Sequence, residues 1–308
     1  MQGTSPISGM PNTRSGIVRG TGGFSIIGLP IALIIGAIGA VAIGAALFYS
    51  GKLIYLIFVS VIIAAALVGT VAVIAMSIGK VRNNILAFLL GAIIGIGAYG
   101  AYRVIEYLDF IQETKNEVHK EDPTAKDADI EVFINYQLRL ETGDDGFIGF
   151  TKYMAQEGFS VTRATSSSSS SSGLDIKDGL AWGYWGLEVL IMAFGGGLGA
   201  ISKSKQPYCR EEGRWLKYQP QAQVPREYAD AFMMAFKNGD LRGAAQYLQP
   251  IDRNAPLPKL YIELGRCNDQ VPDGVVKITA LRPQVKNKSN DQVLFDGEVG
   301  NVNLLFNR

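Results

Sequence analysis

Histidine and cysteine, the side chains on which many catalytic and metal sites depend, are nearly missing from this sequence. Its 308 residues include one histidine, His119, and two cysteines, Cys209 and Cys267. A structural zinc site takes four ligands, usually with closely spaced Cys pairs. A Ser-His-Asp set or a cysteine nucleophile needs a histidine within hydrogen-bonding reach. The scarcity argues against zinc and against a catalytic triad, so we expect no metal, no cofactor and no enzymatic activity.

Charge is missing from three long stretches and almost missing from a fourth. Residues 24–48, 53–78 and 85–102 contain no Asp, Glu, Lys, Arg or His, and residues 180–201 contain only Glu188. A helix needs roughly 20 apolar residues to cross the ~30 Å hydrocarbon core of a bilayer. Backbone groups there are satisfied only in helices or closed barrels, and these stretches are too long for barrel strands. The sequence predicts an α-helical multi-pass membrane protein with four transmembrane helices.

The net charge of +1 hides an uneven distribution along the chain. Residues 103–179 hold 8 Lys/Arg against 15 Asp/Glu, a net charge of −7, whereas residues 202–308 hold 16 against 12, a net charge of +4. The positive excess is too diffuse to favour nucleic acid as a partner. Charge asymmetry in a membrane protein indicates first which side of the bilayer each segment occupies.

Basic residues next to the apolar stretches predict the orientation. They flank the first stretch on its N-terminal side, the turn after the second and the exit of the last: Arg14, Arg19, Lys80, Arg82, Lys203, Lys205, Arg210 and Arg214. With four spans, all of these lie on one side, which the positive-inside rule makes the cytoplasm. A three-span alternative would put the basic exit of the last stretch on the wrong side. The first stretch is also longer than the apolar region of a signal peptide, so we expect an uncleaved anchor in a plasma (inner) membrane of bacterial type.

Small residues recur at every fourth position of the first stretch. They are Gly28, Ala32, Gly36, Ala40 and Gly44. This spacing gives one smooth helix face against which another helix can pack closely. The face has two interpretations, packing within a single bundle and a seam between copies of the chain, of which the first is the commoner use.

The third stretch continues beyond the membrane as an amphipathic stalk. Apolar residues from Val104 to Val118 recur at helical spacing, so we expect one helix from residue 85 to about residue 119, ending at Asp122-Pro123. Two short helices are predicted at 130–140 and 150–156, and a strand at 159–162. Serines at 166–172 predict a low-complexity linker, so that residues 103–179 form an extracytoplasmic stalk, a small acidic, mostly helical domain and a linker.

Residues 202–308 predict a cytoplasmic α+β domain with its own core. Two helices are expected at 225–236 and 241–248, a stretch similar to one helical hairpin of the tetratricopeptide type, which implies local geometry and no repeat. Strands are expected at 260–264, 275–280 and 292–295, with a further strand at 301–306 and turns at 268–274 and 283–291. The cysteines of this domain would face a reducing compartment, so we expect them to remain unlinked.

Glu188 is the candidate intramembrane polar site, because a carboxylate inside a span is costly and usually faces the bundle interior or a water-filled cavity. Three roles stay open for it: a structural hydrogen bond, for example with Tyr184 one turn earlier, a proton or cation site, and a contact with another subunit. Aromatic residues at the ends of the last stretch are the candidate interfacial anchors. They are Trp182, Tyr184, Trp185 and Trp215.

The predicted organisation is therefore a flexible cytoplasmic tail (1–23), three transmembrane helices (24–102), the extracytoplasmic segment (103–179), a fourth transmembrane helix (180–201) and the cytoplasmic domain (202–308). With mass on both sides of the bilayer and no catalytic set, the sequence favours a non-catalytic scaffold, accessory subunit or regulator of a membrane complex. Its expected partners are the lipid bilayer and other membrane-protein subunits or further copies of itself. The alternative is a small transporter or channel subunit that uses Glu188, and a membrane enzyme comes third.

Overall fold

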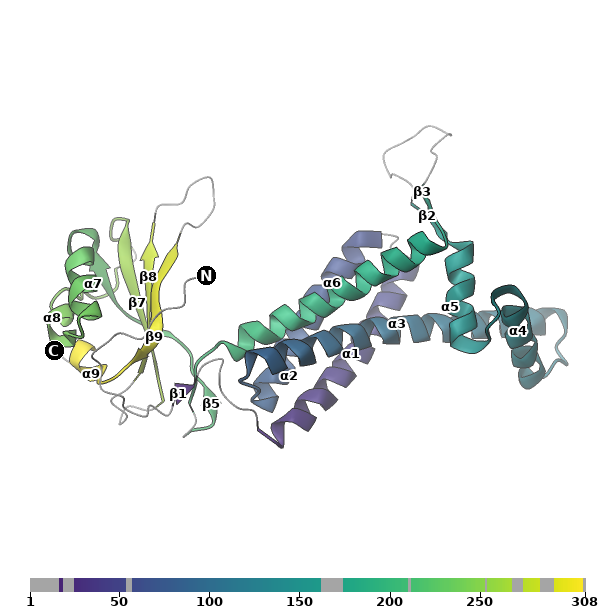
Figure 1. Ribbon diagram of the computed structural model, residues 1–308, viewed down its shortest axis with the longest axis horizontal. Coiled ribbons are helices and arrows are strands. Elements are labelled where there is room, and N and C mark those ends of the chain that lie inside the picture. Colours follow the sequence, from purple (N-terminus) through teal and green to yellow (C-terminus); the bar gives the residue numbers. More distant parts are fainter. Residues whose placement is uncertain are drawn as a thin grey trace. The chain divides into compact units, whose positions relative to one another are not determined.

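The computed structural model describes residues 17–18, 25–53, 57–161, 174–209, 212–252, 254–267, 274–282 and 291–306. The chain divides into two compact units, which we call the helical unit (Phe24–Lys203) and the sheet unit (Met1–Gly23 with Ser204–Arg308). Each unit has its own hydrophobic core, and Figure 1 labels the elements of both. The predicted serine linker at 166–172 and most of the predicted turns at 268–274 and 283–291 lie outside the described residues.

Four long helices form the body of the helical unit (Figure 1). They are α1 (Gly28–Leu53), α2 (Ile57–Gly79), α3 (Asn84–Glu121) and α6 (Gly179–Ser204), and all four contain a segment long and apolar enough to cross a membrane. Large apolar side chains point outward, whereas the core between the helices is rich in alanine. This is the pattern expected where lipid surrounds the bundle and helices pack through small residues.

The small-residue stripe of α1 faces α2 and α3 of the same chain. All five of its residues are buried. A Cβ added at Gly36 would lie 2.6 Å from Ile94 of α3, and one added at Gly44 would lie 2.7 Å from the backbone of Ala98. The approach of α1 to α3 therefore depends on missing side chains. Pro30 lies in the first turn of α1, where its missing N–H leaves no helix hydrogen bond unmade.

Helix α6 packs on α2 and α3 through a second set of glycines. An added Cβ would overlap the opposing backbone at Gly91 and Gly95 of α3 and at Gly196 and Gly199 of α6. Backbone-to-backbone contact of this kind leaves no room for any side chain. The glycine-rich end of α6 is thus fixed by contact with its neighbours.

Helix α3 extends well past the apolar stretch, as the periodicity predicts. Asn83 caps its start by accepting hydrogen bonds from the N–H groups of Ile85 and Leu86, and the extended backbone of Asp122 ends it before Pro123. Its distal half packs against α4 (Asp127–Thr142) and α5 (Gly146–Glu157) around Ile130, Ile134, Leu138 and Phe150. The strands β2 (Phe159–Val161) and β3 (Leu174–Ile176) then form an antiparallel pair that leads to α6.

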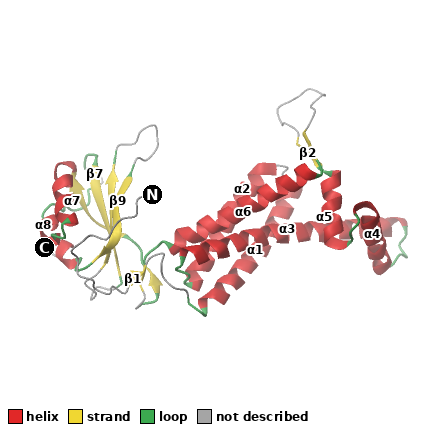
Figure 2. Cartoon of the chain, viewed as in Figure 1, coloured by secondary structure: helices red, strands yellow, loops and turns green. Residues whose placement is uncertain are grey.

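The sheet unit contains a four-stranded antiparallel sheet, shown in yellow in Figure 2. Its order is β6 (Gln219–Pro225), β7 (Lys259–Arg266), β8 (Gly274–Leu281) and β9 (Gln292–Val299). The helices η1 (Arg226–Tyr228), α7 (Ala229–Lys237), α8 (Leu241–Ala245) and α9 (Asn303–Phe306) accompany it. Phe232, Phe236 and Leu305 pack with Ile262 and Ile278 of the sheet, so the core lies between the helices and one sheet face.

One strand prediction for this unit is wrong. Residues 301–306 form no strand, because Val302 and Leu305 are the buried pair and their spacing of three is helical. The fourth strand is instead β6, in which glutamines alternate with apolar residues but Pro220 and Pro225 weaken the strand signal. The expected N-terminal tail also contributes a strand, β1 (Ile17–Val18), which pairs with β4 (Tyr208–Cys209), and β4 pairs with β5 (Arg214–Trp215).

Candidate functional site

A polar cluster lies at the end of the apolar stretch of α3 and at the start of the apolar stretch of α6. Its members are spaced by one helical turn on each helix, so they share the facing sides of the two helices. They are Tyr99, Tyr102, Arg103 and Glu106 from α3, with Tyr184, Trp185 and Glu188 from α6. On the side of the cluster toward the middle of the bundle, the glycine contacts hold α3 and α6 close together. On the side toward α5 and β3, Ala155 and Ile176 belong to the same buried group.

Glu188 lies inside this cluster and its carboxylate is hydrogen-bonded. The hydroxyl of Tyr99 donates to Glu188 Oε2 at 3.0 Å. Tyr184, one turn earlier on α6, provides a second side-chain hydrogen bond. The carboxylate therefore faces α3, and two phenol hydroxyls offset part of the cost of its removal from water.

Arg103 is the most buried charged group of the cluster, with 6% of its surface exposed. Its Nη1 pairs with Glu106 Oε2 at 2.5 Å, and its guanidinium lies over the Trp185 ring, 4.2 Å from the centroid. The other terminal nitrogen, Nη2, is buried without a hydrogen-bond partner among the described residues. One cation thus stands between two carboxylates, Glu106 one turn away on α3 and Glu188 on α6.

Three of the four predicted interfacial anchors lie at the start of α6, and two of these three side chains are accessible to solvent. Trp182 is half exposed, and Tyr184 is partly exposed. Trp185 is buried under Arg103 and contacts the core between α3 and α6. Trp215, in the sheet unit, packs against the ring of Tyr208 with their centroids 5.1 Å apart. Trp185 is therefore a packed member of the polar cluster and not an exposed anchor.

A second group of charges joins α3 to α4. The Nζ of Lys115, on a residue only 9% exposed, pairs with Glu131 and lies 3.5 Å from Asp127 Oδ2, and His119 Nε2 lies 2.8 Å from Asp127 Oδ1. The hydrogen bond with His119, followed by the charge of Lys115, holds the pKa of Asp127 below its usual range. These pairs fix the start of α4 on the stalk. Within the described residues no three His, Cys, Asp or Glu side chains gather as a metal-binding group.

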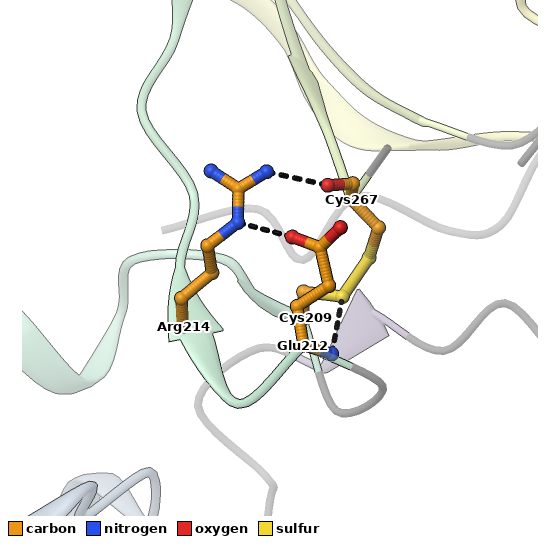
Figure 3. Close-up of a disulfide and its surroundings, with 4 residues drawn as sticks. All are labelled: Cys209, Glu212, Arg214 and Cys267. Atoms are coloured by element: carbon orange, nitrogen blue, oxygen red, sulfur yellow. Dashed lines mark hydrogen bonds and ion pairs between the residues drawn. A yellow bond between two sulfur atoms is a disulfide. The ribbon is translucent and has the colours of Figure 1, made fainter. Parts of the chain in front are cut away.

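The two cysteines are joined by a disulfide, so the prediction of unlinked thiols is wrong. Cys209 and Cys267 are linked with their Cα atoms 5.5 Å apart (Figure 3). Both are buried beside Leu216 and Val275. The prediction rested on the compartment assigned to residues 202–308, and no local pattern indicates that the two cysteines lie close together. β4 and the end of β7 meet only when the small sheet packs beside the main one.

Sequence reasoning found Glu188 and Tyr184 but missed Arg103, Tyr99 and Glu106. Arg103 and Glu106 carried a usable signal, because they are the first charged residues after an apolar stretch and are spaced for an ion pair on one helix face. Tyr99 carried none, since nothing in the sequence states that α6 faces α3. No protein-family model matches the chain, and no curated protein or solved structure is found to be similar to it.

Replacement of Glu188 should distinguish a structural carboxylate from one that carries protons or cations. We expect Glu188→Gln to keep the bundle folded, because the amide oxygen still accepts from Tyr99. Glu188→Leu should lower the free energy of unfolding by roughly 1–3 kcal/mol, because it leaves the Tyr99 hydroxyl unpaired. Thermal denaturation in detergent measures both. A well-folded Glu188→Gln protein that fails to complement a deletion strain would favour the transport role instead.

Proposed function

We propose that this chain is a non-catalytic integral membrane scaffold or accessory subunit that binds a partner protein through α4. One observation carries the proposal: α4 has two apolar faces, and the described residues of the chain cover only one of them. Ile130, Ile134 and Leu138 pack onto α3 and α5. The other face carries Val132, Phe133, Tyr136 and Leu140, which are 69%, 55%, 58% and 61% exposed. We call these four residues the α4 face.

Lipid explains the exposed apolar residues of the four long helices but not the α4 face. Glu131 at the start of this face pairs with Lys115, whereas the apolar stretch of α3 ends just before Arg103. At 1.5 Å per residue, Lys115 lies about 18 Å farther along the helix. The headgroup layer on one side of a bilayer adds only about 5–8 Å to the hydrocarbon core. We therefore infer that the exposed aromatic side chains of Phe133 and Tyr136 contact a protein partner.

The charge around the α4 face specifies the chemistry of that partner. Residues 103–179 carry a net charge of −7, and the exposed Asp129 and Glu141 border the face at its two ends. Two copies of so acidic a segment repel each other, whereas an apolar segment flanked by Lys or Arg is attracted. The occupant we propose is such a segment of another membrane or membrane-associated protein.

The polar cluster supports a non-catalytic role, since its carboxylates are paired within the cluster. Tyr99 donates to Glu188, and Arg103 is divided between Glu106 and the ring of Trp185. Such a network holds α3 and α6 in register at the point where the α4–α5 domain begins. Helix α3 then carries any displacement of that domain directly into the bundle, as a regulator that couples the two sides of the bilayer would require.

For orientation we propose a plasma (inner) membrane protein with both termini in the cytoplasm. The basic flanks support this side. The pairing of β1 with β4 supports an even number of spans, because it joins a strand before α1 to a strand after α6. An impermeant maleimide tests the side. A cysteine at the exposed position Lys237, in a chain without Cys209 and Cys267, should react only after the membrane is opened.

Site-specific photocrosslinking tests the partner site. A benzophenone amino acid at Val132 should give one defined adduct with a second protein, and the crosslinked peptide should contain an apolar segment with basic flanks. Phe133→Asp and Tyr136→Asp should each reduce that adduct at least tenfold, because they place charge in the buried contact. Both side chains are more than half exposed, so the fold should survive, which circular dichroism checks.

The same benzophenone at Glu117, an exposed position on α3, is the matched control and should not give this adduct. An adduct of the chain with itself would favour a homo-oligomer and the transporter alternative. Adducts with lipid alone, or an adduct that both aspartate variants retain, would contradict the proposal.

A further inference from the structure

The disulfide ties a small sheet, β1-β4-β5, to the main sheet of the same unit. Cys209 belongs to β4, which follows α6 closely in the sequence, and Cys267 directly follows β7 of the main sheet. The small sheet β1-β4-β5 has only two residue pairs between each of its neighbouring strands. So short a ladder has little stability of its own. The covalent bond therefore adds to the contacts of Arg214 and Leu216 that fasten the small sheet to the main one.

The groups around the disulfide suit a thiolate as well as a disulfide (Figure 3). The backbone N–H of Glu212 donates to Cys209 Sγ at 3.5 Å. Arg214 Nη2 donates to the carbonyl oxygen of Cys267 at 2.5 Å, and its Nε pairs with Glu212. The backbone donor favours the thiolate of Cys209, which is the form that attacks a disulfide, whereas the charge of Arg214 is offset by its ion pair with Glu212.

Non-covalent contacts would keep the domain folded without the cross-link. Leu216, Val275 and Tyr218 pack around the two cysteines, and the main core around Phe232 and Ile262 does not involve them. Both cysteines are buried, at 0% and 1% exposure, so a reagent reaches them only when β4 and β5 lift away. Local opening of such a short hairpin costs less than global unfolding.

We propose that Cys209 and Cys267 form a reversible redox modification site that fastens or releases the small sheet. The proposal rests on the cytoplasmic orientation proposed above, since disulfides in that compartment are usually transient or redox-sensing. The oxidant is a small-molecule disulfide of the glutathione class. The Cys209 thiolate attacks one of its sulfurs and expels a thiolate, which leaves a mixed disulfide. The Cys267 thiolate then attacks Sγ of Cys209 and expels the second, so two protein thiols are oxidised and one small disulfide is reduced to two thiols.

Glutathione buffers applied to the purified full-length chain in detergent test this site. Differential alkylation and mass spectrometry should show the cysteine pair passing between oxidised and reduced forms across cytosolic ratios of the thiol and its disulfide. Hydrogen exchange of the amides in residues 208–215 should rise on the order of tenfold or more on reduction, because removal of the cross-link frees the hairpin. Amides of β7 and β8 should stay protected. The Cys209→Ser/Cys267→Ser chain should show the fast exchange in every buffer.

Failure of the site and failure of the orientation give different results. If the pair stays oxidised in reducing buffer, or if reduction unfolds β7 and β8, the disulfide is a fixed structural bond and the redox site is overturned. If the cysteine at Lys237 reacts with impermeant maleimide on intact cells, the orientation itself is wrong, and the redox proposal falls with it. The binding of a partner at the α4 face is measured separately by the crosslink at Val132 and stands or falls alone.

Discussion

Gly95→Ala is expected to lower the free energy of unfolding of the helical unit by about 3 kcal/mol, because overpacking against a fixed neighbour cannot relax by side-chain rotation. The added methyl group would overlap the backbone carbonyl of Met192 on α6. To relieve this overlap, α3 and α6 must move apart. That movement would also separate the residues of the polar cluster, which begins one turn farther along α3. Chemical denaturation in detergent micelles, followed by the fluorescence of Trp182 and Trp185 at the start of α6, measures the loss.

Gly100→Ala is the matched control on the same helix. No heavy atom lies within 4 Å of the Cβ that would be added there, and Gly100 is exposed. Alanine also has the higher helix propensity, by up to about 1 kcal/mol in water. This variant should be unchanged or slightly more stable than the parent chain. Equal stability of the two alanine variants would show that α6 does not approach α3 as closely as the structure describes.

The long helices were predictable because long apolar stretches without charge leave a strong pattern in the sequence. The charge-free stretches 24–48, 53–78 and 85–102 correspond to α1, α2 and the first half of α3, and the apolar repeat beyond Val104 predicted the rest of α3. Such an apolar stretch is recognised without knowledge of tertiary contacts. Helix–helix contacts do require such knowledge. The sequence therefore indicated the small-residue stripe on α1 but not that it packs against α2 and α3.

The remaining wrong or missing predictions have the same physical origin, which is their dependence on tertiary contacts. β6 was missed because a strand at a sheet edge is held by its neighbour β7 and needs little strand propensity of its own. The helix α9 was mistaken for a strand because Val302, Leu304 and Phe306 alternate in sequence, whereas the main core buries Val302 and Leu305. The disulfide and the contact of Tyr99 with Glu188 each join residues far apart in sequence, which no local pattern can indicate.

Arg103→Met is expected to destabilise the helical unit by about 3 kcal/mol or more near neutral pH. The change leaves the Glu106 carboxylate, only 22% exposed, without its counter-ion and removes the guanidinium from the ring of Trp185. Breaking one side of a buried ion pair costs far more than replacing both sides, because the remaining charge is still out of water. The double variant Arg103→Met/Glu106→Gln should therefore recover most of the loss.

The pH dependence separates this electrostatic cost from a loss of packing. Below the pKa of Glu106 its carboxyl group is neutral and needs no cation, so the destabilisation by Arg103→Met should shrink as the pH falls. A packing defect would be independent of pH. Arg103→Lys keeps the charge but loses the planar fork and the stacking on Trp185, so it should lie between the parent chain and the methionine variant. A double variant no more stable than Arg103→Met, at any pH, would mean that Arg103 stabilises α3 and α6 through Trp185 or the Glu188 carboxylate and not through Glu106.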